Sequence, residues 1–437
     1  MLTLLGILIF AIGLLASIAL HELGHMTPAK KFGVKVPQYM VGFGPTLWSR
    51  IKGETEYGIK AIPLGGYIRM IGMFPPNPKG PQDPEKLGRM GQMIESAREE
   101  VLAEISPEDE SRTFYRLSVP KKLTVMFGGP FMNLVIATIL FTISLSVIGR
   151  PEVTTTVSDV IKCVPTAANP NGIPSTSGTC DDGVATPAAE IGLSAGDTLI
   201  AVNDMEIATW DDLGTALADE AGNQVDVTYL TSTGETITKS VEVAALESEV
   251  FDDSGQATGE VSTRGFLGVM PSFDLVQAPV SEVPGFMASV TSASIGALFE
   301  FPARVFGLAG ELFTDAPRDP EGPVSVVGIG RISGQITSSE DVPAIYKVGD
   351  LITLLASVNL FLFVFNMVPI LPLDGGHIAG ALYEGARRQV ARVRRKPLPG
   401  PVDTAKMLPV AYVMSLVLLA MSAIVILADI IKPMSFY

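Results

Sequence analysis

Four long stretches of the chain are almost purely apolar, and polar or charged segments separate them. Each stretch has close to the roughly 20 residues that a helix needs to cross the hydrocarbon core of a bilayer. The pattern therefore predicts a polytopic α-helical membrane protein with four transmembrane helices. The apolar stretches are residues 2–20, 123–149, 351–373 and 408–431.

The first apolar stretch ends in the sequence His21-Glu22-Leu23-Gly24-His25. Residues four apart lie on one face of a helix, so both imidazoles can reach a single metal ion. Glu22 then lies close enough to take a proton from a water molecule at the metal. Ionisable groups at the end of a membrane-length segment are costly and mark function. The motif predicts a metal site; the alternative is a polar cap at the membrane surface that binds no metal.

Composition narrows the class of protein. The chain has 437 residues, of which 47% are hydrophobic and only 18% are charged, which is too apolar for an ordinary soluble domain. Its net charge of −15 argues against a nucleic-acid partner. It has three histidines, His21, His25 and His377, and all of them lie in the two motifs that we select for chemistry.

The distribution of Lys and Arg predicts the orientation in the membrane. Fifteen of them lie in residues 26–122 and seven in 376–406, whereas the much longer segment 150–346 has seven against a large excess of Asp and Glu. Basic residues favour the cytoplasmic side. We therefore predict that 26–122 and 376–406 are cytoplasmic, and that 150–346 and both termini lie outside the cell membrane.

In this topology the first and third spans run in the same direction, so their ends lie at similar depth. The third span ends in a segment where Pro369 and Pro372 break the helix and two glycines, 375–376, let the backbone turn inward. A catalytic zinc site has three protein ligands and one open position. Asp374 is the natural third ligand, and His377 is either a rival ligand or an orienting partner. The alternative is a plain turn that closes the helix.

Three motifs follow one another along the chain: His21–His25, Gly129-Pro130-Phe131-Met132-Asn133, and Asn366-x-x-Pro369 with Leu373-Asp374-Gly375. In this order they resemble the site-2 protease family of intramembrane zinc metalloproteases, and the RseP-type bacterial enzymes with a PDZ domain above all. The resemblance implies that His21, His25 and Asp374 hold Zn²⁺ and that Glu22 activates water. It also implies regulated intramembrane proteolysis of a single-span membrane protein, usually an anti-sigma factor already shortened outside the membrane.

The cytoplasmic segment 33–73 has short β-like runs, at 34–43, 58–62 and 67–73. Within it, the sequence around Gly65 and Gly66 resembles the family's Pro-Leu-Gly-Gly-Tyr, part of a membrane-dipping β hairpin. A strand edge beside the metal would hold an unwound substrate by main-chain hydrogen bonds. The alternative is a sheet that only packs the loop.

The next segment, 74–118, begins Pro-rich and then becomes charged, with a helix predicted over 85–105. We assign it no chemistry.

Three asparagines interrupt the apolar spans, and a buried amide in a membrane bonds either a neighbouring helix or a substrate backbone. Asn133 lies in the second span, and both alternatives stay open for it. Asn359 and Asn366 are seven residues apart in the third span, hence on one helix face. Both alternatives also stay open for Asn359, while Asn366 is expected to contact the substrate and polarise the scissile carbonyl.

The outer segment contains a predicted soluble α+β domain. Residues 188–203 resemble the core of a PDZ domain, and a helix at 209–220 and strands at 225–230 and 236–243 follow in PDZ order. In the protease interpretation this domain is a size filter that admits only substrates whose outer part has been removed.

Cys163 and Cys180 lie in a Pro-, Asn-, Ser- and Gly-rich insertion before the PDZ-like core. Two cysteines close in sequence on the oxidising side predict one disulfide. Closing such a loop contributes about 3 kcal/mol in the chain-entropy model. They lie on the wrong side of the membrane to bind the metal. An amphipathic helix at the outer interface is predicted over 284–314.

Two functions of different class compete: an intramembrane zinc endopeptidase, and an inactive membrane scaffold whose PDZ domain binds peptide tails. The combination of His21, Glu22, His25 and Asp374 at one depth favours the protease. A zinc transporter is a weak third alternative, because few ionisable groups line a path across the membrane. The predicted order is a first span in 1–25, a cytoplasmic region in 26–122, a second span in 123–149, a PDZ domain in 150–270, an interfacial linker in 271–346, a third span in 347–375, a basic cytoplasmic loop in 376–406 and a fourth span in 407–431.

Overall fold

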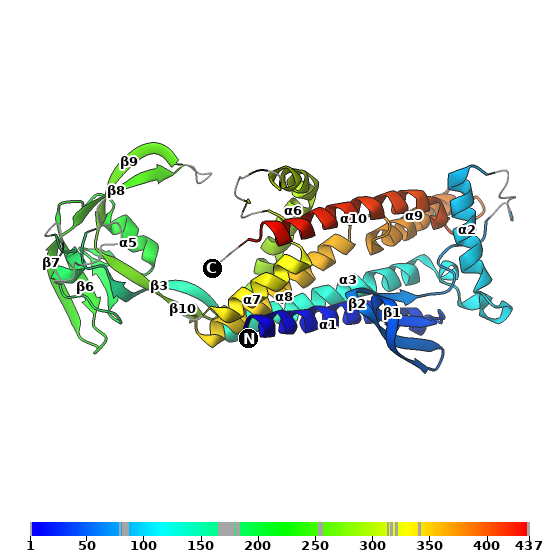
Figure 1. Cartoon of the computed structure of the whole chain (residues 1–437), viewed down its shortest axis with the longest axis horizontal. Coiled ribbons are helices and arrows are strands. Elements are labelled where there is room, and N and C mark those ends of the chain that lie inside the picture. The colour runs from blue at the N-terminus through cyan, green and yellow to red at the C-terminus, as the bar shows by residue number, and fades with distance from the viewer. Residues whose placement is uncertain are drawn as a thin grey trace. The chain divides into compact units, whose positions relative to one another are not determined.

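The computed structural model (Figure 1) describes residues 2–434, except for 78–79, 81–86, 165–179, 181–183, 252–256, 313, 315–317, 320–321 and 340–341. The start of the predicted helix 85–105, part of the Pro-rich segment before it, and the middle of the cysteine-containing insertion lie outside the described residues. The chain forms two compact units. The first, the membrane unit, comprises Met1–Ile148 and Ala278–Tyr437, and the second comprises Gly149–Gln277.

In the described part of the membrane unit, four helices are long and apolar enough to cross a bilayer, as the hydrophobic pattern predicts. Of these, α1, α3 and α8 lie along one another (Figure 1). These helices are α1 (Leu2–Lys31), α3 (Val119–Thr142) with its continuation η4 (Ile143–Ile148), α8 (Ala344–Asn366), and α10 (Leu408–Ile431) after the short η6 (Thr404–Met407).

The α1–α3 crossing is very close because both helices present glycine there. A Cβ on Gly24 would lie 2.3 Å from the carbonyl oxygen of Gly128, and a Cβ on Gly128 would lie 2.1 Å from that of Gly24. No larger residue fits at either position without moving a backbone. Small residues allow this kind of approach between membrane helices, where packing rather than hydrophobic transfer supplies the attraction.

The segment predicted as an interfacial linker, 271–346, contains two helices in the membrane unit, α6 (Val283–Glu311) after η5 (Val280–Glu282), and α7 (Val326–Ser338). The sequence predicts the first helix and misses the second. α7 lies along α1, where a Cβ on Gly6 would lie 2.4 Å from the carbonyl oxygen of Ser333. Asp429 of α10 accepts a hydrogen bond from the backbone N–H of Ser325 at 2.7 Å, so a side chain 104 residues away helps to cap this helix.

Residues 38–69 form a sheet of two long, bent strands, β1 (Gln38–Lys52) and β2 (Thr55–Arg69). The start of β1 is paired on both sides: residues 38–41 pair with 66–69 on one side and with 56–59 on the other. The strands predicted at 34–43, 58–62 and 67–73 are therefore partly wrong. Strand structure continues through Trp48, because β1 bends at Gly42 and Gly44, where φ is positive, and pairs again beyond the bend.

Two buried ionic contacts fasten the remaining helices of the membrane unit. Lys122 of α3 donates to Glu384 of α9 at 2.8 Å, and Arg98 of α2 donates to both oxygens of Asp403 at 2.8 and 2.9 Å. Buried charges need such partners, so these pairs fix where α9 and α2 lie. The elements are α2 (Arg89–Ala103), η2 (Pro107–Arg112), η3 (Phe114–Arg116) and α9 (Asp374–Val393).

The unit Gly149–Gln277 is an α+β unit with its own core. Strands β10, β3, β4, β6 and β7 form a sheet in that order, with β5 paired to β4, and β8 pairs with β9. The predicted helix at 209–220 and strands at 225–230 and 236–243 are confirmed as α5, β6 and β7. The elements are β3 (Arg150–Val160), α4 (Pro187–Glu190), β4 (Thr198–Val202), β5 (Met205–Glu206), α5 (Trp210–Leu217), β6 (Gln224–Leu230), β7 (Thr236–Glu242), β8 (Ala244–Phe251), β9 (Ala257–Phe266) and β10 (Val269–Val276).

Candidate metal centre

His21 and His25 project from one face of α1, one helical turn apart. The helix continues without interruption to Lys31, so the motif lies inside the helix rather than at a frayed end. The two rings meet edge to face with centroids 4.9 Å apart, and their Nε2 atoms are 3.2 Å apart. This arrangement follows from the spacing of four residues.

Asp374 is the first residue of α9, and the turn before it aims its side chain at α1. The helix α8 ends at Asn366, and residues 367–373 form an irregular turn that includes Pro369 and Pro372. The helix break that these prolines predict is confirmed. A Cβ on Gly375 would lie 2.2 Å from the carbonyl oxygen of Val368, so only glycine lets the first turn of α9 lie so close to this segment.

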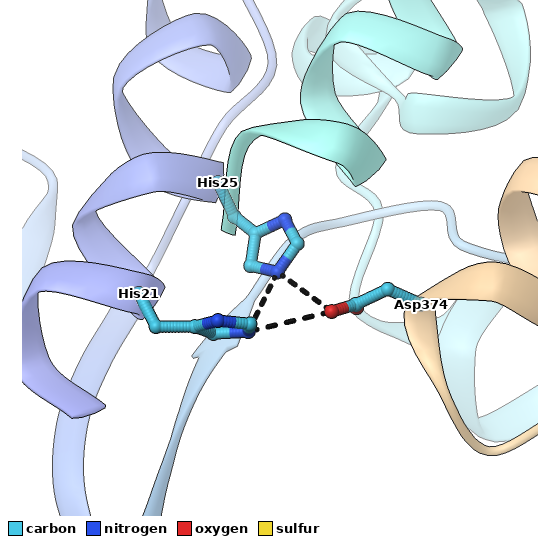
Figure 2. Close-up of side chains that lie close together, drawn as sticks. All are labelled: His21, His25 and Asp374. Atoms are coloured by element: carbon cyan, nitrogen blue, oxygen red, sulfur yellow. Dashed lines mark hydrogen bonds and ion pairs between the residues drawn. The ribbon is translucent and has the colours of Figure 1, made fainter. Parts of the chain in front are cut away.

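The structure brings the side chains of His21, His25 and Asp374 together (Figure 2). The Oδ2 atom of Asp374 is 3.3 Å from each Nε2 atom, so the three atoms form a nearly equilateral triangle. A tetrahedral zinc ion with bonds of about 2.0 to 2.1 Å has ligand atoms about 3.3 to 3.4 Å apart. The spacing of these three atoms therefore fits one face of a zinc tetrahedron.

The ring of His25 is also held from its other side. Its Nδ1 atom lies 2.8 Å from the carbonyl oxygen of Val125 in α3, and the side chain is only 6% exposed. A carbonyl can only accept a hydrogen bond, so Nδ1 carries the proton and donates it. This leaves the lone pair of Nε2 directed toward Asp374, which is the usual arrangement of a metal-binding histidine.

His377, the rival ligand, lies one turn further along α9. Among the described residues, it does not belong to the group of His, Cys, Asp and Glu side chains whose ligand atoms approach within 4.8 Å of one another around His21. Asp374 fills that place. The sequence alone does not separate these two residues, because the decisive factor is the turn that starts α9.

Glu22 lies beside the sheet. The backbone of Gly66 in β2 is so close to α1 that a Cβ there would lie 3.0 Å from the Cγ of Glu22. The backbone amide of Ile68 interacts with the Glu22 carboxylate. The strand 66–69 pairs with 38–41 along one edge, and no other described strand pairs with its second edge. The sheet edge and Glu22 are therefore direct neighbours, and Gly65 precedes them with a positive φ of 122°.

The three asparagines lie in different surroundings. Asn359 is fully buried, and its amide donates to the Oγ of Ser17 at 3.0 Å, so the structure places it in a contact between α8 and α1. Asn133 of α3 is also buried, and its Oδ1 has no hydrogen-bond partner among the described residues. Asn366 is half-buried at the end of α8, just before the turn that leads to Asp374.

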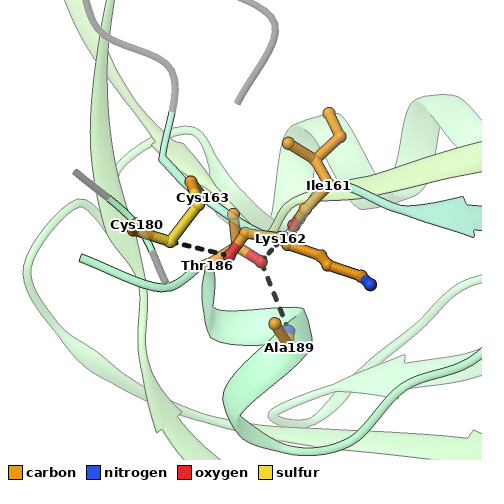
Figure 3. The surroundings of a disulfide bond; sticks show 6 residues. All are labelled: Ile161, Lys162, Cys163, Cys180, Thr186 and Ala189. Atoms are coloured by element: carbon orange, nitrogen blue, oxygen red, sulfur yellow. Dashed lines mark hydrogen bonds between the residues drawn. A yellow bond between two sulfur atoms is a disulfide. The ribbon is translucent and has the colours of Figure 1, made fainter. Parts of the chain in front are cut away.

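Cys163 and Cys180 are joined in the second unit, with an S–S distance of 2.07 Å and Cα atoms 5.5 Å apart (Figure 3). Thr186 ties the neighbouring chain together: its hydroxyl accepts a hydrogen bond from the backbone N–H of Ala189 at 3.3 Å and donates to the carbonyl of Ile161. The disulfide lies beside the start of α4, and neither cysteine belongs to the group of possible metal ligands found among the described residues.

The sequence is similar to a family of peptidases and to several proteins of known name. The sequence profile described as "Peptidase family M50" matches residues 9–408. The zinc metalloprotease Rip1 of Mycobacterium bovis (strain BCG) is 31% identical over 442 residues, which cover 99% of this chain and 98% of the relative. The zinc metalloprotease Rip1 of Mycolicibacterium smegmatis is 32% identical over 444 residues and 99% of both chains. Metalloprotease MmpA of Caulobacter vibrioides is 25% identical over 402 residues and 89% of both chains.

The matched region begins within α1 and ends at the start of α10, so it includes His21, His25 and Asp374. The relatives named as zinc metalloproteases extend over nearly the whole chain. Together with the four apolar helices, these matches identify the protein as a membrane zinc metalloprotease that belongs to peptidase family M50, the site-2 protease family.

Proposed function

We propose that the protein cuts single-span membrane proteins inside or next to the bilayer, with His21, His25 and Asp374 as the ligands of its zinc ion. The observation that carries this proposal is the triangle of Nε2, Nε2 and Oδ2 atoms with edges of 3.2 to 3.3 Å. Three protein ligands leave one position open, as catalytic zinc sites require. Two corners of the triangle lie in the apolar helix α1, so the peptide bond that it serves is in or near the membrane.

Glu22 is the proposed general base. Zinc supplies a Lewis acid for the scissile carbonyl and makes water more acidic. Glu22 follows the ligand His21 directly in α1, and its carboxylate takes the proton of the attacking water and returns it to the leaving nitrogen. The half-buried position of Glu22, against the sheet, restricts how much other water reaches this carboxylate.

The open edge of the strand 66–69 is the proposed binding place for the substrate. A peptide bond inside a helix is shielded by its own hydrogen bonds, so a substrate must unwind before it can be cut. An extended segment that adds to a strand edge regains main-chain hydrogen bonds. Gly66 keeps this edge close to Glu22. Gly65, Gly66, Asn366 and Asn133 are proposed to contact the substrate. The contact with Ser17 supports the other interpretation for Asn359, that of a link between helices.

We infer that the natural substrate resembles a membrane-bound anti-sigma factor whose outer part has already been removed. The order of strands and helix in the unit Gly149–Gln277 supports a PDZ-like domain, which we propose acts as a size filter. The distribution of Lys and Arg supports an orientation in the bacterial cell membrane with this unit and both termini outside, and with the metal site toward the cytoplasm.

The test uses the full-length protein in lipid nanodiscs with a trimmed single-span substrate. Glu22→Gln is expected to retain one zinc per molecule and to lose cleavage at least about 100-fold, because only the proton-accepting group is removed. Asp374→Asn is expected to lose zinc as well as cleavage. His377→Gln is the matched control, which keeps zinc.

Each outcome bears on one part of the proposal. Cleavage by Glu22→Gln at the wild-type rate would exclude Glu22 as the base. If His377→Gln loses zinc and Asp374→Asn keeps it, His377 rather than Asp374 is the third ligand. Normal zinc content without cleavage of any single-span substrate would favour the inactive scaffold.

A further inference from the structure

The face of α3 that meets the two histidines contains no side chain at the point of contact. Gly129 lies there, and a Cβ on it would be 2.1 Å from the Nε2 of His25 and 2.7 Å from the Nε2 of His21. Both distances are below any that real Cβ atoms show, and both involve the very atoms that face Asp374. A single added methyl group must therefore move one or both imidazoles.

The same face of α3 holds His25 by a hydrogen bond. Val125 lies one turn before Gly129, and its carbonyl oxygen accepts from the Nδ1 of His25 at 2.8 Å. Val125 is completely buried, so no solvent competes for this carbonyl. The hydrogen bond to this oxygen determines that Nδ1 of His25 carries the proton. The absence of a Cβ at Gly129 leaves the room in which Nε2 lies.

His21 lacks an equivalent partner. Its Nδ1 is buried and, among the described residues, has no hydrogen-bond partner. Its other nitrogen, Nε2, faces the Nε2 of His25 and the Oδ2 of Asp374, and a Cβ on Gly129 would lie 2.7 Å from that same atom. The two ligands are held by different means, yet one stretch of α3 acts on both.

We propose that Gly129 is a positioning residue that sets the place of both zinc-binding imidazoles, with the carbonyl of Val125 fixing the tautomer of His25. This inference rests on the proposed ligand set. In this proposal α3 supplies no zinc ligand. Its backbone at Gly129 instead limits where the two Nε2 atoms of α1 lie, and so keeps them at the separation that zinc requires. Groups that orient metal ligands typically alter metal affinity about 10- to 100-fold when changed.

The experiment compares Gly129→Ala with Gly296→Ala in the full-length protein. Gly296 is the matched control, since it also lies inside a long helix, α6, but a Cβ there meets nothing within 4 Å. Zinc affinity is measured by competition with a chelator, and the visible absorption of the cobalt-substituted protein reports the ligand geometry. Gly129→Ala is expected to bind zinc about 10- to 100-fold more weakly and to change the cobalt spectrum. Gly296→Ala is expected to match the wild type.

A wild-type affinity and cobalt spectrum in Gly129→Ala would overturn the proposal, and a fall in the Tm of the zinc-free protein alone would assign Gly129 to helix packing. His25→Ala tests the proposed ligand set separately from the role of Gly129. If His25→Ala keeps wild-type zinc affinity, the ligand set itself is wrong. Should Gly129→Ala fail to fold, the variant that also carries His21→Ala and His25→Ala decides, because it removes both imidazoles that the added Cβ would meet. Folding restored by the smaller side chains supports a clash with the imidazoles, and folding not restored contradicts it.

Discussion

Tyr39 joins the sheet to α1 through one hydrogen bond. Its hydroxyl donates to the backbone carbonyl of Ala19 at 2.6 Å, while its backbone pairs with that of Ile68 in the strand beside Glu22. Burial, and then the negative charge of Glu22, raise the pKa of Tyr39 to about 12. The tyrosine therefore keeps the proton that this hydrogen bond needs well above the ordinary pKa of about 10.

The raised pKa predicts a particular dependence of stability on pH. A group whose pKa is higher in the folded state contributes its full stability below the unfolded value and loses it as the pH rises to the folded value. The wild type is therefore expected to lose more thermal stability between pH 10 and 12 than Tyr39→Phe does. Tyr412→Phe, at an exposed position of α10, is the control and is expected to show the wild-type loss. Equal pH profiles for Tyr39→Phe and the wild type would contradict this role.

At the scale of single residues, the type of side chain explains why part of the candidate site can be predicted from the sequence. His21, His25 and Asp374 are costly in an apolar segment, so their presence is a signal. The carbonyl of Val125 gives no such signal, because every residue has the same backbone acceptor. Only the crossing of α1 and α3 brings this carbonyl to the ring of His25. The sequence contains the glycine of the contact, Gly129, but does not reveal the atoms that require it.

Among the elements, a substitution in the strand edge 66–69 is expected to affect substrate binding without affecting metal binding. A methyl group in Gly66→Ala would lie 3.0 Å from the Glu22 side chain and 3.1 Å from the carbonyl oxygen of Met40. Either the strand or the Glu22 side chain must move by a few tenths of an ångström. We therefore expect kcat/KM for a single-span substrate to fall about tenfold, equivalent to about 1.4 kcal/mol of transition-state stabilisation. Zinc content is expected to stay unchanged, because neither contact involves a proposed ligand.

The matched control for the strand edge is Ser49→Ala, which lies in the same sheet on the exposed stretch that pairs with Gly58. It is expected to cleave at the wild-type rate. Undiminished cleavage by Gly66→Ala would mean that the sheet only packs the segment 33–73. Loss of zinc by Gly66→Ala would mean that the strand supports the metal site rather than the substrate.

A helix or strand can be predicted from the sequence when residues within or next to it determine its structure. Apolar run length is local, so the helices α1, α3, α8 and α10 are predicted. The break after Asn366 is also local, because it depends on two prolines. The helix α7 is missed, since its capping by Asp429 and its contact with Gly6 connect residues far apart in the chain. The second half of β1 is missed because pairing, rather than composition, keeps it extended beyond Gly44.

In the molecule as a whole, the unit Gly149–Gln277 is an insertion whose two ends return to one place in the membrane unit. The backbone N–H of Ala278, which follows the inserted unit, donates to the carbonyl of Leu145, just before it, at 2.9 Å. A two-glycine linker between Ile148 and Ala278 therefore replaces the unit without stretching the membrane helices. The insertion has its own apolar core, around Val157, Leu199 and Val227, and the apolar clusters found among the described residues of the membrane unit are made of that unit's own side chains.

This excision tests the proposed size filter directly. The shortened protein is expected to retain zinc, since all three proposed ligands lie in the membrane unit, and to cut a single-span substrate that still carries its folded outer domain. The wild type is expected to cut that substrate only after trimming. The same excision combined with Glu22→Gln is the control and should cut neither form. If the shortened protein retains zinc and cuts trimmed substrate yet still rejects the untrimmed one, selection by size resides in the membrane unit and the inserted domain is not the filter.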